Sequence, residues 1–196
     1  MAIFAQYRTN EWELFIGNAL MLATALLYLV WWRLAFWPGT GGKTGIGSFM
    51  VAGAMLSGVL SLVVVGIGIA STPLGGRGAP TIAIILGAAL SYFVLIAVTT
   101  AFFHRVLTAE LLVIVVWAAV ELLVVNALYA CGRFAAAQAV GCVAAVALAS
   151  LIGLACYVLY YRLNGYPSFW DGLVPLAVDA LATAGLLFAQ AASKAG

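Results

Sequence analysis

Long uninterrupted apolar runs dominate the chain, with few stretches in which polar and apolar residues alternate. Six runs reach the length of about 20 residues that an α-helix needs to cross a hydrocarbon core of ~30 Å. They cover residues 14–37, 48–71, 81–103, 109–131, 134–161 and 172–193. A membrane β-barrel would instead show short segments of strict alternation. The pattern therefore predicts an all-α integral membrane protein, a compact bundle of about six transmembrane helices with short loops.

The segments between the runs are too short to hold a separate soluble domain. We therefore expect residues 1–196 to form a single polytopic membrane domain. The first run is too long for a signal-peptide core and is expected to be a retained span. Residues 1–13 mix Trp12 with Arg8 and Glu11, which suits either an interfacial helix or a frayed terminus.

Composition supports the membrane assignment. Hydrophobic residues make up 66% of the chain and charged residues only 7%, whereas soluble domains carry roughly 25% charged residues to keep their surface hydrated. The lipid bilayer is therefore the first expected partner, and the plasma or inner membrane of a cell is the expected location. A partner nucleic acid is not expected, because the chain offers no soluble basic surface.

Positive charge does not orient the predicted bundle. With six spans both ends of the chain lie on one side of the membrane, here called side A, and the other side is side B. Side A holds Arg8, Arg77, Arg133 and Lys194, and side B holds Arg33, Lys43, Arg105 and Arg162. Because the two sides carry equal numbers of Lys and Arg, the positive-inside rule favours neither orientation. Aromatic residues are less even, because many fall at the side B ends of the runs, as in an interfacial belt.

The segment FWPGTGGKTG, residues 36–45, contains the Gly-Lys-Thr ending of a nucleotide-binding loop. The full motif, G-x-x-x-x-G-K-[ST], needs a first glycine, a preceding strand and a following helix. Trp37 occupies the position of that first glycine, and both flanking runs are membrane spans. We interpret the segment as a turn, in which Lys43 and the glycine amides are a candidate contact for a lipid phosphate.

The supply of catalytic and metal-binding side chains is small. His104 is the one histidine, so a bis-histidine haem and a His-rich metal site are disfavoured. Cys142 and Cys156 lie about 21 Å apart along one helix, which is too far for a disulfide. No G-x-S-x-G motif supports a serine hydrolase. We expect no cofactor and no metal, and an enzyme is less favoured than a protein without catalytic activity.

His104 itself has two interpretations. It lies beside Arg105 at the side B end of the third run, where an interfacial polar pair is common. Its functional interpretation is a proton-sensing or quinone-contacting group, because an imidazole changes its charge near neutral pH.

Glu121 lies near the middle of the fourth run, within LLVIVVWAAVELLVVNALYA. A charge at that depth costs at least ~2.5 kcal/mol, so such a residue faces protein or water, is protonated, or is paired. The helical period places Glu110, Trp117 and Glu121 on one face, running from side B to the midplane. Asn126 is turned away from this face and is predicted to contact another helix.

Asp179 is a second ionisable residue inside a run, about 12 Å from the predicted start of the sixth helix. Pro175 precedes it by one helical turn and removes a backbone donor there. A loosened turn beside a buried carboxylate is a common way to build an ion or solute site in a membrane helix. We therefore expect a path or pocket for a substrate or ion. Its residues are Glu121, Asp179, Trp117, Asn18 and Glu110. The alternative is that neighbouring polar side chains satisfy the carboxylates, which then only hold helices together.

Small residues recur at every fourth position of the fifth run, at Ala137, Gly141, Ala145, Ala149 and Gly153. Such a ridge lets helices approach closely, either within the protein or against another subunit. Shorter pairs of this kind occur at Ala19 and Ala23 and at Gly53 and Ser57.

The favoured hypothesis is a small membrane transport protein, or the membrane-embedded subunit of a transporter or channel, that moves a small solute or ion with its intramembrane carboxylates. The alternative is a non-catalytic anchor or assembly subunit of a larger membrane complex, and a small integral membrane enzyme comes third. In the first two cases we expect a homo-oligomer or an association with other membrane subunits. Small channels, importer subunits and ion-pumping complexes share this format, so the format alone does not separate them.

Overall fold

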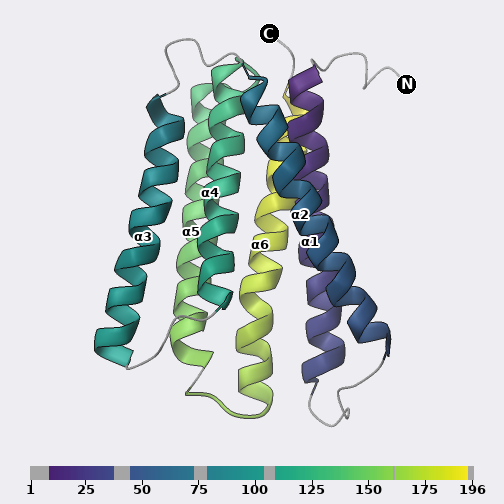
Figure 1. Ribbon diagram of the computed structural model, residues 1–196, viewed down its shortest axis with the longest axis vertical. Helices are drawn as coiled ribbons and strands as arrows, with labels where there is room; N and C mark the ends of the chain where they lie inside the picture. The colour runs from purple at the N-terminus through teal and green to yellow at the C-terminus, as the bar shows by residue number, and fades with distance from the viewer. Residues whose placement is uncertain (1–8, 38–44, 73–78, 104–108, 161, 194–196) are drawn as a thin grey trace.

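The computed structural model describes residues 9–37, 45–72, 79–103, 109–160 and 162–193. These residues form six long helices: α1 (Thr9–Phe36), α2 (Gly45–Ala70), α3 (Ala79–Phe103), α4 (Ala109–Ala130), α5 (Ala136–Tyr160) and α6 (Tyr166–Ala192). All six are long and apolar enough to cross a membrane, and they pack side by side as a bundle (Figure 1). The predicted fold class is therefore confirmed.

Two helices begin at least five residues earlier than the sequence prediction. α1 begins at Thr9, so residues 9–13 continue the first helix, and residues 1–8 lie outside the described part of the chain. α6 begins at Tyr166 rather than at residue 172. Pro167 stands in its first turn, where an amide hydrogen has no partner within the helix in any case. Within YPSFWDG, Phe169 packs against Trp37 just after α1, and the Phe169 carbonyl accepts from the indole of Trp32 on α1. Hydropathy alone does not reveal these contacts.

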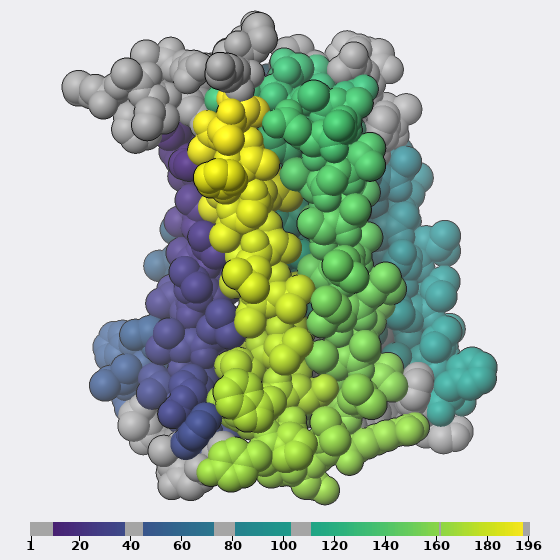
Figure 2. Space-filling model, turned by 180° about the vertical axis from the view of Figure 1, so that it is seen from behind, coloured from purple at the N-terminus to yellow at the C-terminus, as the bar shows by residue number. Residues whose placement is uncertain are grey.

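Five of the helices surround a common interior. α6 lies between α1 and α5, α1 packs along α2, and α4 contacts both α5 and α2. Seen from behind, α6 runs between α1 and α5 across the face of the molecule (Figure 2). α4 is the most deeply buried span, and its lower end lies above the lower ends of α3, α5 and α6 in Figure 1.

α3 stands at the edge of the bundle, where its main contact is with α4 (Figure 1). Among its described side chains only Thr99 is buried, and the Thr99 hydroxyl bonds to the carbonyl of Leu95 in the same helix at 2.7 Å. The side chain of Asn126 on α4 donates to Thr81 of α3 at 3.0 Å. The prediction that Asn126 contacts another helix is confirmed.

Small residues bring α1 and α2 into direct contact. A methyl group on Gly17 would overlap the side chain of Val65, so the two helices touch at the backbone there. The hydroxyl of Ser61 donates to the carbonyl of Gly17 at 2.7 Å. Gly17 and Ser61 are both small and uncharged. Small residues at a contact let the backbones of two membrane helices approach closely.

The predicted ridge on α5 packs inside the protein only in its second half. Ala149 and Gly153 are buried, and a methyl group on Gly153 would lie 3.3 Å from Cδ1 of Ile114 on α4. Gly141 and Ala145 are exposed on the outer face, and nothing lies within 4 Å of a methyl group built on Gly141. The ridge therefore serves the contact with α4 at its lower end and faces outward at its upper end.

Candidate functional site

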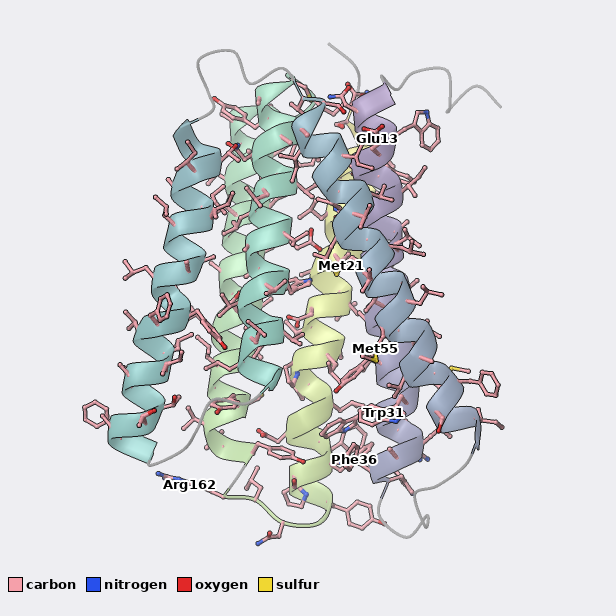
Figure 3. All side chains as sticks on the ribbon, in the orientation of Figure 1. Glu13, Met21, Trp31, Phe36, Met55 and Arg162 are labelled. Atoms are coloured by element: carbon pink, nitrogen blue, oxygen red, sulfur yellow. The ribbon has the colours of Figure 1, made fainter. Side chains whose placement is uncertain are left out.

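A polar cluster lies inside the apolar bundle where α1, α4 and α6 meet. Asn18, Glu121 and Thr183 have no exposed surface, and Asp179 is 8% exposed. The cluster is surrounded by apolar core residues, including Met21, Val120 and Val124. Met21 marks its level in Figure 3, between α1 and α6 near the middle of the bundle.

Two hydrogen bonds in series hold the carboxyl group of Glu121. Nε1 of Trp117 donates to Oγ1 of Thr183 at 3.1 Å, and Oγ1 of Thr183 donates to Oε1 of Glu121 at 2.5 Å. An indole nitrogen can only donate a hydrogen bond. The Thr183 hydroxyl accepts this hydrogen and gives its own hydrogen to Glu121, so Oε1 is an acceptor here.

The buried face of α6 brings Asp179 to the same place. Asp179 and Thr183 are separated by one helical turn, so their side chains lie on the same face. Asp179 is close enough to interact electrostatically with Glu121 on α4. Two carboxyl groups from different helices therefore share the interior of the bundle.

Several polar atoms of this cluster have no hydrogen-bond partner among the described residues. They are Oε2 of Glu121, Oδ1 of Asp179, and both Oδ1 and Nδ2 of Asn18. The Asn18 amide lies within hydrogen-bonding reach of the Glu121 carboxyl group, but neither of its polar atoms makes a hydrogen bond of ordinary geometry. Buried polar groups in proteins are normally paired, and an unpaired one costs about 1–3 kcal/mol. An arrangement of this kind can bind a proton, a cation or a small polar solute.

The structure thus brings together four residues of the predicted path: Asn18, Trp117, Glu121 and Asp179. Their role in transport stays a prediction. Glu110 lies in the first turn of α4, but its side chain is outside the described part of the structure. His104 and Lys43 also lie outside the described residues.

Sequence reasoning missed Thr183, which joins the two halves of the site. The signal for it was its position four residues after Asp179, because that spacing places both on one face of a helix. Threonine is also common in apolar helices as a packing residue, so the spacing alone did not single it out.

A second polar contact lies at the side A end of the bundle, between Arg133 and Glu11. The sequence pattern had counted Arg133 among the charges of the side A loops. NH1 of Arg133 lies 3.8 Å from Oε2 of Glu11, and both side chains are buried. Gly132, with φ 79°, ends α4, and the amide of Arg133 then bonds back to the carbonyl of Leu128 at 2.9 Å. This left-handed helix end turns Arg133 inward. The side chain of Gln190 donates to the carbonyl of Glu11 at 3.2 Å and ties α6 to the same point.

Aromatic side chains fill the side B end, as the sequence predicted. Nε1 of Trp32 donates to the carbonyl of Phe169 at 3.1 Å, which joins α1 to the start of α6. Trp31 and Phe36 lie between these helices (Figure 3), with their ring centroids 5.4 Å apart. The guanidinium group of Arg33 stacks 3.6 Å from the centroid of Trp37, a favourable cation–π contact at a membrane edge.

Metal ligands are not grouped in the described part of the chain: no three side chains of His, Cys, Asp or Glu come together there. No disulfide joins Cys131, Cys142 or Cys156. No family model matches the chain, and no curated protein or solved structure matches it significantly.

Proposed function

We propose that the protein is a small membrane transport protein, or the membrane-embedded subunit of a transporter, in which Glu121, Asp179 and Asn18 bind a small solute or ion. One observation carries this proposal. Polar atoms from three helices converge in the bundle interior, and four of them have no hydrogen-bond partner among the described residues.

Other polar residues of the same protein show what a structural role looks like. Ser61 donates to Gly17 on the neighbouring helix, Asn126 donates to Thr81, and Thr24 bonds to Ser57. Each of these side chains uses its hydrogen bond to join two helices, as polar groups in membrane proteins commonly do. Asn18 lies beside Glu121 of α4, but neither of its amide atoms makes a hydrogen bond of ordinary geometry, although it is an amide like Asn126 and is fully buried.

The cost of the cluster supports the same interpretation. Each unpaired buried group lowers stability by about 1–3 kcal/mol, and a buried carboxylate costs more than a neutral group. Leucine or alanine in these places would pack the interior without that cost. A bound solute or ion would supply the hydrogen-bond partners that these polar atoms lack. That role explains why polar rather than apolar side chains occupy these positions.

The alternative function, an anchor or assembly subunit, has an observation of its own. α3 buries little surface within the chain, and Gly141 and Ala145 present a smooth outer face on α5. Both surfaces suit packing against helices of another subunit. They do not explain the unpaired polar atoms inside the bundle, so transport is the stronger proposal.

Cysteine accessibility separates the two functions without knowledge of the substrate. Cys131, Cys142 and Cys156 are first replaced by alanine, and Asn18→Cys is introduced in that background. The protein in lipid vesicles is then treated, from either side, with a charged thiosulfonate reagent that does not cross membranes. Asn164→Cys, in the exposed turn before α6, is the positive control, and Ala127→Cys, at a position 1% exposed, is the buried control.

A transport path must admit water and solutes to the cluster at some stage of its cycle. We therefore expect Asn18→Cys to react from at least one side, more slowly than Asn164→Cys but far faster than Ala127→Cys. Equal and negligible reaction at positions 18 and 127 would contradict a transport function and favour the anchor subunit.

A further inference from the structure

We infer that the interior cluster is a proton-binding site, in which Glu121 holds one dissociable proton on Oε2 and Asp179 Oδ1 is the second acceptor for it. This inference deepens the proposed function by naming the ion, and it rests on that function only for the use that transport makes of the proton. The existence of the proton site is tested separately below.

The direction of the hydrogen-bond chain identifies the oxygen. Thr183 accepts from the Trp117 indole and donates its own hydrogen to Oε1 of Glu121. Oε1 already accepts the Thr183 hydrogen, so a hydrogen bonded to Oε1 and pointing toward Thr183 would clash with it. A proton on Glu121 therefore belongs on Oε2, the oxygen that has no hydrogen-bond partner among the described residues.

Asn18 is suited to both protonation states of Glu121. An amide carries an acceptor oxygen and a donor nitrogen, and here neither is engaged in a hydrogen bond of ordinary geometry. When Oε2 carries a proton, the amide oxygen can accept it; when Oε2 is ionised, a turn of the amide presents the nitrogen as a donor. A side chain fixed in a structural bond has no such freedom.

A metal ion fits the same atoms less well. Sodium-like or calcium-like ions take many oxygen ligands, whereas the cluster contributes an unpaired nitrogen donor as well as oxygens. The described residues hold no group of three His, Cys, Asp or Glu side chains for a metal. A proton needs only one lone pair at a time, which the cluster supplies.

The charges that face Glu121 are few. α6 contributes Asp179, and α5 contributes Cys142, a neutral thiol in its ordinary state. α1 contributes the uncharged amide of Asn18, and α2 contains no ionisable residue. The buried cation Arg133 is paired with Glu11 at the side A end of the bundle rather than with the cluster. Two ionised carboxylates in one low-dielectric interior repel each other, and one shared proton removes that repulsion.

Transfer within the pair conserves atoms and charge. When the proton passes from Oε2 of Glu121 to Oδ1 of Asp179, directly or through an intervening water, one O–H bond to Glu121 breaks and one to Asp179 forms. Before the step the negative charge is on Asp179, and after it the charge is on Glu121. No oxidant, reductant or other reactant is required, and exchange with water at either carboxyl loads or releases the proton.

Infrared difference spectroscopy of the purified protein in lipid nanodiscs tests the site directly. Spectra are recorded as the pH is lowered, in a buffer whose cation is N-methylglucamine. We expect a carbonyl band of a protonated carboxyl group that Glu121→Gln abolishes. Asp171→Asn removes a carboxyl group from the same helix as Asp179, and it should leave this band unchanged.

Two threonine variants keep the test decisive if Glu121→Gln fails to fold. Thr183→Val removes the hydrogen bond to Oε1, so the band should move to higher frequency because a free carbonyl bond is stiffer. Thr99→Val makes the same chemical change on α3, where the hydroxyl bonds only to carbonyls of its own helix. It should leave the band where it is in the parent.

Three outcomes would overturn the inference. They are a band that persists in Glu121→Gln, a band that Thr183→Val does not move, and a titration that shifts when sodium or lithium replaces N-methylglucamine, since that shift would show a metal ion in the site. The infrared result does not depend on transport. A titrating Glu121 band together with an unreactive Asn18→Cys supports the proton site and contradicts the transport function. A reactive Asn18→Cys without the band supports the transport function and contradicts the proton site.

Discussion

The indole ring of Trp32 on α1 covers Gly172 on α6, and a methyl group built on Gly172 would overlap the ring. The same indole donates to the carbonyl of Phe169, one turn earlier on α6, at 3.1 Å. The first and last helices of the chain therefore meet at side B, where the Trp32 ring lies against the backbone of Gly172.

Gly172→Ala should destabilise the protein, because the new methyl group has to displace an aromatic ring held by its own hydrogen bond. Overpacking of this kind costs about 1–3 kcal/mol. The measurement is the thermal unfolding midpoint in detergent. Gly185→Ala on the same helix is the matched control, since nothing lies within 4 Å of its added methyl group. Equal midpoints for the two variants would show that α1 and α6 separate easily at side B.

Gly17→Ala should weaken the contact between α1 and α2 by a similar ~1–3 kcal/mol. Its methyl group would meet Val65 at both side chain and backbone, and the backbone nitrogen of Val65 would lie 3.0 Å away. Gly66→Ala, with no atom within 4 Å, is the control. Resistance to unfolding by sodium dodecyl sulfate is a suitable measure, and a parental value for Gly17→Ala would argue against tight packing at this crossing.

Gly153→Leu and Gly141→Leu should behave differently although they lie on one ridge of α5. Gly153 is buried against Ile114, so an isobutyl group there should lower stability by about 1–3 kcal/mol. Gly141 is exposed, and the stability of the single chain should not change. The oligomeric state of Gly141→Leu is the second measurement, because a changed state would show that the outer half of the ridge contacts another subunit.

Breaking the ion pair between Arg133 and Glu11 from one side should cost more than removing it entirely. Loss of one partner from a buried pair leaves an uncompensated charge and costs about 3–5 kcal/mol. Arg133→Met and Glu11→Gln are compared with the double variant in a thermodynamic cycle. We expect the double variant to lose clearly less stability than the sum of the single variants, whereas additive losses would mean that the pair contributes no coupling.

Thr183→Val should lower stability by about 1–2 kcal/mol, because both the Trp117 indole and Oε1 of Glu121 lose their partner. Thr99→Val should change stability far less, since the hydroxyl of Thr99 bonds only within its own helix. Thermal melting of the two variants in the same detergent provides the comparison. The emission of Trp117 should also shift in Thr183→Val, and Trp117→Phe identifies that part of the signal.

The number and kind of helices followed from the sequence because length and hydropathy belong to each segment by itself. The shared face of Trp117 and Glu121 followed for the same reason, since the helical period relates residues of one helix. The prediction for Asn126 succeeded because a polar side chain turned away from that face needs some other neighbour, and Thr81 supplies it.

The sequence could not predict which residues of different helices contact one another in the bundle interior. Nothing in the period of α6 states that Thr183 meets Glu121, because the rotation of one helix against another is set by packing over its whole length. α3 carries no charged residue and its apolar residues surround the whole helix, so its sequence does not indicate which side faces lipid and which faces protein. Arg133 was counted as a surface charge because its inward position depends on the left-handed end of α4 at Gly132.

The hydrogen-bond donor for Glu121 lies 62 residues further along the chain, on the last helix. At a translation rate of about 5–20 residues per second, Thr183 emerges roughly 3–12 s after Glu121. α4 is therefore synthesised before the residue that caps its central carboxyl group. The cluster cannot be completed until α6 has been synthesised, so a chain that stops before α6 lacks the Thr183 hydrogen bond to Glu121.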